Sequence, residues 1–307
     1  MSKSQNTMDP LAISATRPAS YVDHQLLDTP SERGHHIIRA EVCSISAPAK
    51  NLRRIAVQSP ELMGCQLSGP DEFFGLLMPP TPGAQLHLPD HDGGINIRAS
   101  VAAMPEGRRP NLRWYTVRTL DSERGILTFD VVTHGISSPD DEHIGPGLAW
   151  ALSTRIGDDV ALWTCQGLWH RKQASQTLIA DPSAVPSLRA ILEYTQTFAP
   201  EQLPELHVIV LAESHHDLEP LLREQWEDKV GSLKVILRPA TEFSGATLSH
   251  LRQLDEAKDP ATHASYVWVA GEGDLCKEVR RHAIDSWGLK SDSVQWCPYW
   301  FIGRARP

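Results

Sequence analysis

A short run near the middle of the chain holds the residue types best suited to chemistry. In Arg113-Trp114-Tyr115-Thr116-Val117-Arg118, cationic or hydroxyl side chains alternate with aromatic and β-branched ones. This alternation is typical of a strand that sends Arg113, Tyr115 and Val117 to one face. A guanidinium suits a phosphate, a phenol packs on a flat ring, and a hydroxyl can bond a ring nitrogen. Together they could hold three parts of a flavin nucleotide, although a strand of this composition is ordinarily only a strand.

Three segments before this run are expected to be strands that help to position it. Residues 37–45 and 52–58 alternate in polarity around a Ser-Ala-Pro-Ala turn, and residues 71–80 form a third candidate that two prolines close. Residues 81–110 are rich in Pro, Gly, His and Asp, which predicts a long surface loop.

The strand pattern continues after the central run. The turn at 121–125 predicts a hairpin in which residues 126–133 pair with the 113–118 strand. Residues 160–164 add one more strand. Short strands at this spacing are typical of a small antiparallel barrel, here over about residues 35–165.

Within this half of the chain, a glycine- and proline-containing segment leads into a short apolar helix. His134-Gly135 opens the segment, and Gly145-Pro146 precedes Gly147-Leu148-Ala149-Trp150. Amides at a helix start carry partial positive charge and can face a pyrophosphate. An ordinary loop-to-helix junction explains the same pattern equally well.

After Gln166, strands alternate with helices. The expected strands are 176–180, 206–211, 230–237 and 266–269, and the expected helices are 187–198, 218–227 and 275–287. This order implies a parallel sheet with right-handed crossovers and with ligands at the carboxyl ends of its strands. The predicted fold class is therefore β barrel plus α/β, with a flexible extension over 1–34, the barrel domain over 35–170 and the α/β domain over 171–307.

Composition limits the classes of function. The chain has 307 residues and a formal charge of −9, which argues against general nucleic-acid binding because phosphates would be repelled. No apolar run approaches the ~20 residues that cross a bilayer, and the N-terminus lacks a secretory layout, so we expect a cytoplasmic protein without membrane insertion. Five cysteines without a C-x-x-C pair predict no zinc site, iron–sulfur cluster or disulfide framework. Any redox chemistry therefore needs another cofactor.

Several motifs, taken in order, resemble the siderophore-interacting proteins of the ferredoxin–NADP reductase superfamily. They are Asp71 with Leu76-Leu-Met-Pro79, Arg113 to Arg118, Asp130-Val-Val-Thr-His-Gly135, Gly145-Pro146 with Trp150-Ala151, Gly157-Asp-Asp-Val160, Trp268-Val-Ala-Gly-Glu272, and Tyr299-Trp300 before Gly303. The resemblance covers about residues 37–303 and implies an FAD-binding barrel followed by a domain that binds NADH or NADPH. It also implies that ferric siderophore is reduced to release ferrous iron.

The resemblance also assigns the flavin site. Arg113 would bind phosphate, Tyr115 would pack on the ring or ribityl chain, and Thr116 would hydrogen-bond at flavin N5. The full set of expected FAD-binding residues is Arg113, Trp114, Tyr115, Thr116, Asp130, Val131, Val132, His134, Gly135, Gly147, Leu148, Ala149 and Trp150. No catalytic acid or base is nominated, because the flavin itself accepts hydride and passes on electrons.

The expected nucleotide and substrate residues lie elsewhere in the chain. For the nicotinamide nucleotide they are Asp181, Ala184, Glu213, Gly271 and Glu272, and for an anionic ferric siderophore they are Arg53, Arg54, Arg280, Arg281 and Arg304. Glu213 after the second βα strand would repel a 2′-phosphate and so favours NADH, although its loop could simply be solvated. Each arginine taken alone is more ordinarily a solvated surface charge.

Four places depart from the family pattern. They are Gly147-Leu148 where a small residue and a serine usually follow Gly-Pro, Thr164-Cys-Gln-Gly167, Ala180-Asp181-Pro182, and Phe301 in place of a basic residue. Proline at 182 removes an amide donor where a nicotinamide nucleotide would lie. Two alternatives therefore stay open: a general NAD(P)H–flavin oxidoreductase on small acceptors, and a non-enzymatic ferric-chelate binder with a degenerate nucleotide site. A monomer is the working expectation.

Overall fold

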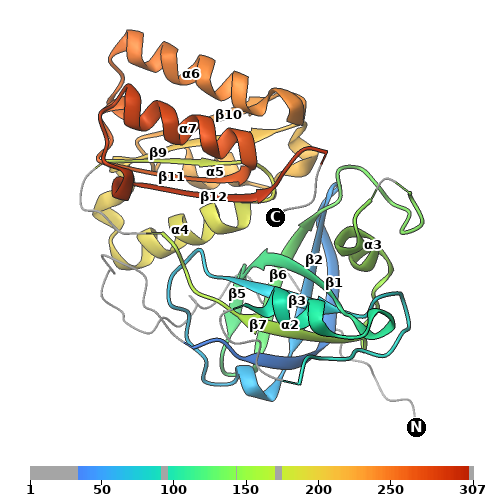
Figure 1. The fold of residues 1–307 in the computed structure, drawn as a ribbon. Coiled ribbons are helices and arrows are strands. Elements are labelled where there is room, and N and C mark those ends of the chain that lie inside the picture. Colours follow the sequence, from blue (N-terminus) through green and yellow to red (C-terminus); the bar gives the residue numbers. More distant parts are fainter. Residues whose placement is uncertain (1–33, 91–95, 143, 170–174, 304–307) are drawn as a thin grey trace.

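Two sheets of different topology make up the molecule (Figure 1). The computed structural model describes residues 34–90, 96–142, 144–169 and 175–303. The extension predicted over 1–34 lies outside these ranges except for Gly34. The first sheet precedes the second in the chain, as the sequence predicted for a β barrel followed by an α/β domain.

The N-terminal domain is an antiparallel sheet of seven strands in the order β4-β3-β7-β1-β2-β6-β5. The strands are β1 (Ile37–Ala49), β2 (Leu52–Gln58), β3 (Phe73–Met78), β4 (Asn111–Thr116), β5 (Thr119–Asp121), β6 (Ile126–Val132) and β7 (Asp159–Thr164). Strands β4 and β5 lie at opposite ends of this order, yet only Val117 and Arg118 separate them. The sheet must therefore curl back on itself, and the Arg118 amide donates to the Thr128 carbonyl across the closure at 2.8 Å. The predicted barrel is confirmed.

The pairing of the central strand differs from the prediction. Residues 126–133 were expected to pair with the 113–118 strand, but β4 pairs with β3, and β6 pairs with β2 and with the three-residue β5. The turn at 121–125 does form a hairpin, but its first arm is β5. Strand β4 ends at Thr116, although the alternation of residue types continues through Arg118. The alternation therefore did not show where the chain passes from β4 to β5 at the other end of the sheet order.

The loop expected over 81–110 contains a helix. Helix α2 (Ile97–Ala103) begins after Asn96, whose side chain accepts a hydrogen bond from the Ala99 amide. Ile97 is almost fully buried and anchors the helix to the barrel core. A second short helix, α3 (Pro146–Ser153), lies where the sequence predicted it, with proline in its first turn.

The C-terminal domain is a parallel sheet of five strands in the order β10-β9-β8-β11-β12. The strands are β8 (Gln176–Ala180), β9 (Leu206–Ala212), β10 (Ser232–Leu237), β11 (Tyr266–Glu272) and β12 (Val294–Trp300). The α-helices are α4 (Val185–Phe198), α5 (Leu222–Trp226), α6 (Phe243–Ala257) and α7 (Gly273–Asp285). The helices differ from the prediction in several places. Helix α6 was not predicted, α5 is half as long as expected, and α7 starts and ends two residues before the predicted bounds. Strand β12 was also missed.

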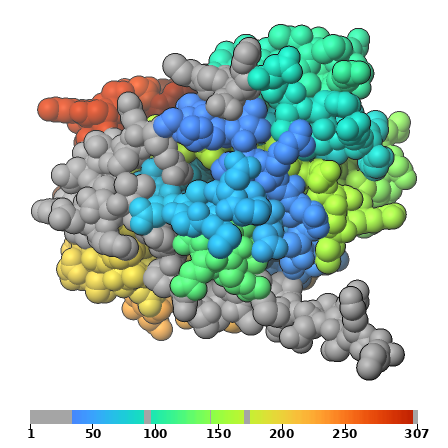
Figure 2. Space-filling model, turned by 90° about the horizontal axis from the view of Figure 1, so that it is seen from below, coloured from blue at the N-terminus to red at the C-terminus, as the bar shows by residue number. Residues whose placement is uncertain are grey.

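Alternate residues of the buried strands face two different layers. Helices α6 and α7 cover one face of the parallel sheet, whereas α4 covers the other and lies between the sheet and the barrel (Figure 1). On the α4 side, Leu178 and Val208 join Leu188 and Phe129 in one cluster that continues into the barrel. Seen from the barrel side, the N-terminal domain forms most of the visible face, with the α/β domain at its margin (Figure 2).

A buried carboxylate ties the domain linker to both sheets. Asp71 Oδ1 accepts hydrogen bonds from the amides of Leu168 and Trp169, at 2.9 and 3.0 Å, and its Oδ2 accepts from Trp268 Nε1 on β11 at 3.2 Å. Burial raises the pKa of Asp71 against these donors. Within the described ranges, no helix is both long and apolar enough to cross a membrane.

Candidate functional site

The predicted phosphate-binding cation lies against the start of α3. A Cβ added to Gly147 would lie 2.8 Å from Arg113 Cγ and 2.9 Å from the Tyr115 hydroxyl, so the helix start contacts both side chains. Arg113 is exposed and donates to the Leu112 carbonyl at 2.7 Å, and no carboxylate of the described residues pairs with it. An unpaired guanidinium beside a helix start has the chemistry to bind a phosphate.

The amides of α3 are less available than the sequence suggested. Those of Leu148 and Ala149 both donate to the Gly145 carbonyl at 3.1 Å, within the helix. Both amides thus already have an acceptor, and their assignment to a pyrophosphate stays a prediction. Gly147 instead contributes by having no side chain, which lets α3 approach β4.

The aromatic residues of β4 point in opposite directions. Tyr115 packs against Phe129 with ring centroids 5.0 Å apart, and burial raises the pKa of its phenol to about 12. Trp150 of α3 stacks on the same Phe129, which makes it a packing neighbour. Trp114 faces away, toward Trp163 at 5.5 Å. Its side chain therefore does not share the Arg113 face, contrary to its inclusion in the flavin site.

The hydroxyl of Thr116 lies between the two domains. It is buried and lies 2.8 Å from the Ser187 hydroxyl of α4, which in turn lies 2.8 Å from the Tyr299 hydroxyl of β12. Ser187 and Tyr299 were not among the expected site residues. Tyr299 belonged to a quoted family motif, but Ser187 had no signal in the sequence because its role depends on contact between domains.

Two buried polar atoms without partners lie near the turn after β6. Asn51 Oδ1 and Arg53 Nε have no hydrogen bond among the described residues, and a Cβ on Gly135 would lie 3.8 Å from Asn51 Oδ1. His134 and Gly135 both have positive φ, at 52° and 78°. An orphan acceptor and an orphan donor fit a bound group that offers both functions, as the polar edge of a flavin does. The residues present thus fit FAD.

Strand β6 contributes less to this site than expected. Asp130 accepts two hydrogen bonds from Arg54, at 2.7 and 2.8 Å, and Arg54 also donates to Glu219 at 2.9 Å. Both partners are buried, so the Asp130 carboxylate and the Arg54 guanidinium are already paired within the protein. Their assignments to the flavin and to a siderophore stay predictions. Val131 and Val132 are ladder partners of β2, and Val131 packs in the core.

The expected nucleotide residues do gather at the carboxyl edge of the parallel sheet. Asp181 follows β8, Glu213 follows β9, and Gly271 and Glu272 end β11. Glu213 is exposed and accepts a hydrogen bond from the Ala240 amide at 2.9 Å. Ala184 is fully buried at the start of α4. The parallel topology thus brings these residues to one edge, as predicted.

Two carboxylates at this edge are already used by the protein. Asp181 is fully buried and accepts from Ser183, from the Glu272 amide at 2.7 Å and from Trp300 Nε1 at 2.8 Å. Glu272 caps α7 by accepting from the amides of Asp274 and Leu275, at 2.7 and 2.9 Å. Both residues are buried, and their assignment to the nucleotide stays a prediction.

Two aromatic residues at the end of β12 and just after it also occupy this edge. The Trp300 ring lies 6.2 Å from the ring of His134, across the domain boundary. The Phe301 ring lies so close to Gly273 that a Cβ there would overlap it. In the sequence, Phe301 stood out only as a departure from the family pattern, because β12 itself was not predicted.

The remaining candidate cations do not gather with the flavin residues. Arg280 stacks over Trp296 at 5.6 Å and donates to Ser291, and Arg281 pairs with Glu278. Both lie in the second half of α7, which runs back from the carboxyl edge after β11. Arg304 lies outside the described residues. Arg53 is the candidate cation that remains near the His134 turn.

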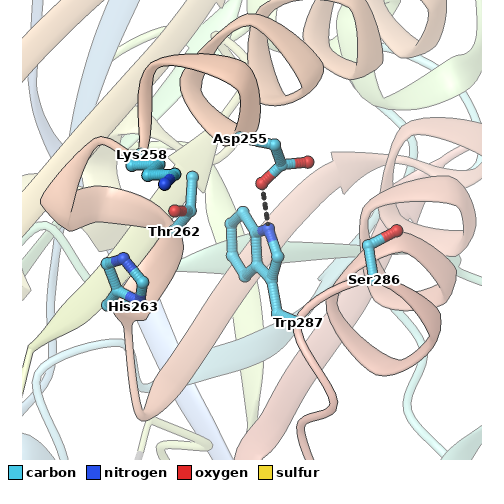
Figure 3. A pocket seen from close by; sticks show the side chains of 6 residues that line it. All are labelled: Asp255, Lys258, Thr262, His263, Ser286 and Trp287. Atoms are coloured by element: carbon cyan, nitrogen blue, oxygen red, sulfur yellow. Dashed lines mark hydrogen bonds between the residues drawn. The ribbon is translucent and has the colours of Figure 1, made fainter.

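A surface cavity of about 420 Å³ lies at the opposite edge of the parallel sheet (Figure 3). Its lining residues are Asp255, Lys258, Thr262, His263, Ser286 and Trp287. They come from the ends of α6 and α7 and from the segment before β11, and Trp287 Nε1 donates to Asp255 at 2.7 Å. Ligands of parallel α/β sheets bind at the carboxyl ends of strands, so this cavity is not the nucleotide site.

Metal chemistry has no candidate among the described residues. They contain no group of three or more His, Cys, Asp or Glu side chains arranged to hold a metal ion, and the five cysteines are free.

The antiparallel barrel, which carries Arg113, Tyr115 and Thr116 beside a short helix, is joined to a parallel α/β domain. This arrangement is the ferredoxin reductase-like fold. The profile described as "Siderophore-interacting FAD-binding domain" matches residues 41–169, and the one described as "Siderophore-interacting protein" matches residues 173–303. The chain belongs to the siderophore-interacting protein family, whose N-terminal domain binds FAD.

Solved structures of siderophore-related proteins and of a ferredoxin reductase share the fold. SipS, the siderophore-interacting protein of Aeromonas hydrophila, is 23% identical with a TM-score of 0.66, over 88% of this chain and 93% of that one. A siderophore utilization protein from T. fusca is 20% identical with a TM-score of 0.69, over 91% and 98%. The ferredoxin reductase of carbazole 1,9a-dioxygenase is 14% identical with a TM-score of 0.58, over 87% and 68%.

The curated relatives are matched over only part of their own length. The mycobactin import ATP-binding/permease protein IrtA of Mycolicibacterium smegmatis is 26% identical over 272 residues, which are 87% of this chain and 26% of that protein. An uncharacterized protein of Mycobacterium tuberculosis is 32% identical over 96 residues, which are 31% of each chain. The chain thus spans about a quarter to a third of the length of the relatives it matches.

Proposed function

We propose that the protein reduces ferric siderophores with electrons from NADH or NADPH that pass through FAD. The observation that carries this proposal is the exposed, unpaired Arg113 guanidinium at the start of α3, inside a domain of the FAD-binding family. When bound, FAD accepts hydride from a nicotinamide and passes electrons on singly, so the protein supplies position and electrostatics. Reduction to ferrous iron loosens the hold of hard oxygen ligands and releases the metal.

Each residue around the barrel corner has a separate task in this proposal. Arg113 neutralises the pyrophosphate, and Gly147 keeps α3 close enough for that contact. Tyr115 packs on the ring or ribityl chain, and Thr116 hydrogen-bonds at N5. Arg53, half-buried and without a partner for its Nε among the described residues, is the cation best placed to attract an anionic ferric chelate.

The electron donor is proposed to enter at the carboxyl edge of the parallel sheet. Glu213 is exposed there and can accept hydrogen bonds from ribose hydroxyls, whereas a 2′-phosphate would be repelled, which favours NADH. Action in the cytoplasm remains our expectation from the sequence.

One observation favours the non-enzymatic alternative. Trp300 and Phe301 lie at the edge where a nicotinamide would approach, and Asp181 and Glu272 are buried there. A chain that could not accept a nucleotide would bind ferric chelates without reducing them. The other alternative, a general flavin reductase, shares the FAD site and differs in its acceptor.

The experiment is an anaerobic reduction assay on the purified full chain. We expect the protein to retain flavin, to bleach with NADH faster than with NADPH, and to recolour with ferric siderophore while a ferrous-specific chelator develops colour. Failure to bleach with either nucleotide supports the binder. Equal recolouring by free flavin or another small acceptor supports the general reductase.

A matched pair of variants tests the phosphate assignment. Arg113→Ala should weaken flavin binding about 10- to 100-fold, since hydrogen bonds to a charged group contribute about 1.5–3 kcal/mol. Arg155→Ala removes another exposed arginine of the same domain and should leave flavin content unchanged. Equal flavin content in both variants, measured by visible absorbance per mole of protein, would show that the assignment is wrong.

A further inference from the structure

Three hydroxyl groups from distant parts of the chain meet at the end of β4. Thr116 comes from the barrel, Ser187 from the first turn of α4 and Tyr299 from β12. The Thr116 and Ser187 oxygens lie 2.8 Å apart, as do those of Ser187 and Tyr299. Ser187 thus links the other two hydroxyls. Thr116 is 5% exposed and Ser187 is fully buried, whereas Tyr299 is partly exposed.

Such a group can reverse the direction of its hydrogen bonds. Each hydroxyl has one hydrogen to donate and lone pairs that accept, and either oxygen in each pair can be the donor. Burial raises the pKa of the Tyr299 phenol, so its hydrogen is present at every physiological pH. Thr116 can therefore direct its own hydrogen away from Ser187 or toward it without leaving a buried group unpaired.

This freedom matches what flavin N5 requires of a neighbouring hydroxyl. In the oxidised ring N5 accepts a hydrogen bond, whereas in the reduced ring N5 carries the hydrogen that arrived as hydride and donates it. A hydroxyl that serves both states must donate in one and accept in the other. When it accepts from N5, its own hydrogen needs another partner, because an unsatisfied buried donor is costly.

We infer that Ser187 and Tyr299 are positioning residues: Ser187 receives the Thr116 hydrogen when FAD is reduced and directs its own hydrogen to Tyr299, and the pair thereby raises the reduction potential of the flavin. The inference rests on the proposed function, which places Thr116 at N5. Among the described residues, Ser187 is the hydroxyl partner that the structure gives Thr116, and Tyr299 is the hydroxyl partner of Ser187. Neither is needed in the oxidised state, in which Thr116 donates to the ring. Their loss should therefore penalise the reduced state selectively.

The test measures the midpoint potential of the bound flavin by anaerobic dye-coupled titration of the full chain. Ser187→Ala and Tyr299→Phe should each shift the potential to more negative values. Both substitutions are repeated in a Thr116→Val background, where no threonine hydrogen exists to be received and neither should add a shift. Thr197→Val, which removes a hydroxyl on α4 that bonds its own helix at the Glu193 carbonyl, is the matched control and should leave the potential unchanged.

The outcomes separate this inference from the proposed function. If wild-type protein retains no flavin, the proposed function is wrong and the inference fails with it. Unchanged potentials in flavin-loaded Ser187→Ala and Tyr299→Phe would refute the inference alone. An equal shift in the presence and absence of the Thr116 hydroxyl would also refute it, because a general loosening of the domain interface would then explain the effect. Two independent single variants keep the test decisive if one does not fold.

Discussion

At the scale of single residues, the burial and the ion pairs of a side chain decide what chemistry it can do. Arg113 and Arg54 are the same residue type in the same domain, but Arg113 is exposed and unpaired with any described carboxylate, whereas Arg54 is buried between Asp130 and Glu219. A buried charge loses its hydration and needs opposite charges beside it, so Arg54 has a structural role. Arg113 kept the freedom to bind a ligand.

The Tyr115 phenol gives a pH prediction. Its pKa is raised by burial from its ordinary value of 10.0 to about 12, so the folded state disfavours the ionised phenol. Stability from this group is complete below pH 10 and is lost as the pH rises from about 10 to about 12. Two pKa units correspond to about 3 kcal/mol.

Chemical denaturation at pH 9 and pH 12 measures this effect. The loss of unfolding free energy between the two pH values should be smaller in Tyr115→Phe than in wild type by about that amount. An identical loss in both proteins would mean that the phenol titrates normally.

At the scale of elements, glycines mark where two elements approach too closely for any side chain. Gly271, at the end of β11, has φ of +135° and lies directly over the Asp181 carboxylate that follows β8. This contact holds the carboxyl edge of the sheet together, because the same carboxylate accepts from the Glu272 amide and from Trp300.

Replacement of Gly271 by alanine should therefore destabilise the fold. Strained φ and overlap with Asp181 together cost about 2–5 kcal/mol. The control is Gly245→Ala in α6, where φ is ordinary and nothing lies within 4 Å of the new Cβ. That variant should be more stable by about 0.5–1 kcal/mol, since alanine favours a helix. Thermal and denaturant unfolding measure both variants, and equal effects of the two would contradict the packing at Gly271.

At the scale of the whole molecule, a buried cluster of charges joins the two domains. The barrel supplies Arg54, Arg118 and Asp130, and the α/β domain supplies Arg189, Glu193 and Glu219. Glu219 is the centre, because its carboxylate lies within 3.3 Å of all three arginines. Burial opposes its ionisation, but Arg118, Arg189 and Arg54 outweigh burial and lower its pKa from 4.5 to about 2.

Removal of this central charge should weaken the joint between the domains. Glu219→Gln leaves three buried cations with fewer counter-charges, which typically costs about 3–5 kcal/mol. Differential scanning calorimetry should show a lower transition temperature and separation of the two domain transitions. Glu227→Gln, which breaks the exposed Arg223–Glu227 pair, should have little effect.

The same cluster predicts acid sensitivity. Because the folded-state pKa of Glu219 is lowered, its stabilising contribution is present above about pH 4.5 and is lost as the pH falls toward 2. Glu219→Gln should therefore lose less stability than wild type across this window. A wild type and a variant with the same pH dependence would show that Glu219 is not the coupled group.

Regular elements with a clear period were predictable from the sequence. Strands β2 and β8 were predicted to the residue, because apolar and β-branched residues fill them between clear turns. Strand β12 was missed because Gln295-Trp-Cys-Pro298 has neither alternation nor a continuous apolar run. Helix α6 was missed because its polar face is rich in Ser, His, Gln and Asp, which lower the helical signal.

The sequence by itself determined the fold class, the order of the domains and the residue types of the flavin strand, because each follows from local periodicity and composition. Tertiary structure alone decided which charged and polar groups stay free. Glu219 lies 165 residues from Arg54, and their contact makes Arg54, a candidate substrate cation, part of the domain interface. Tyr299 lies 112 residues from Ser187, and their contact extends the hydrogen-bonded chain that begins at Thr116. Such partners are separated by too much chain for any local pattern to encode, since burial and pairing are set only when the two domains pack.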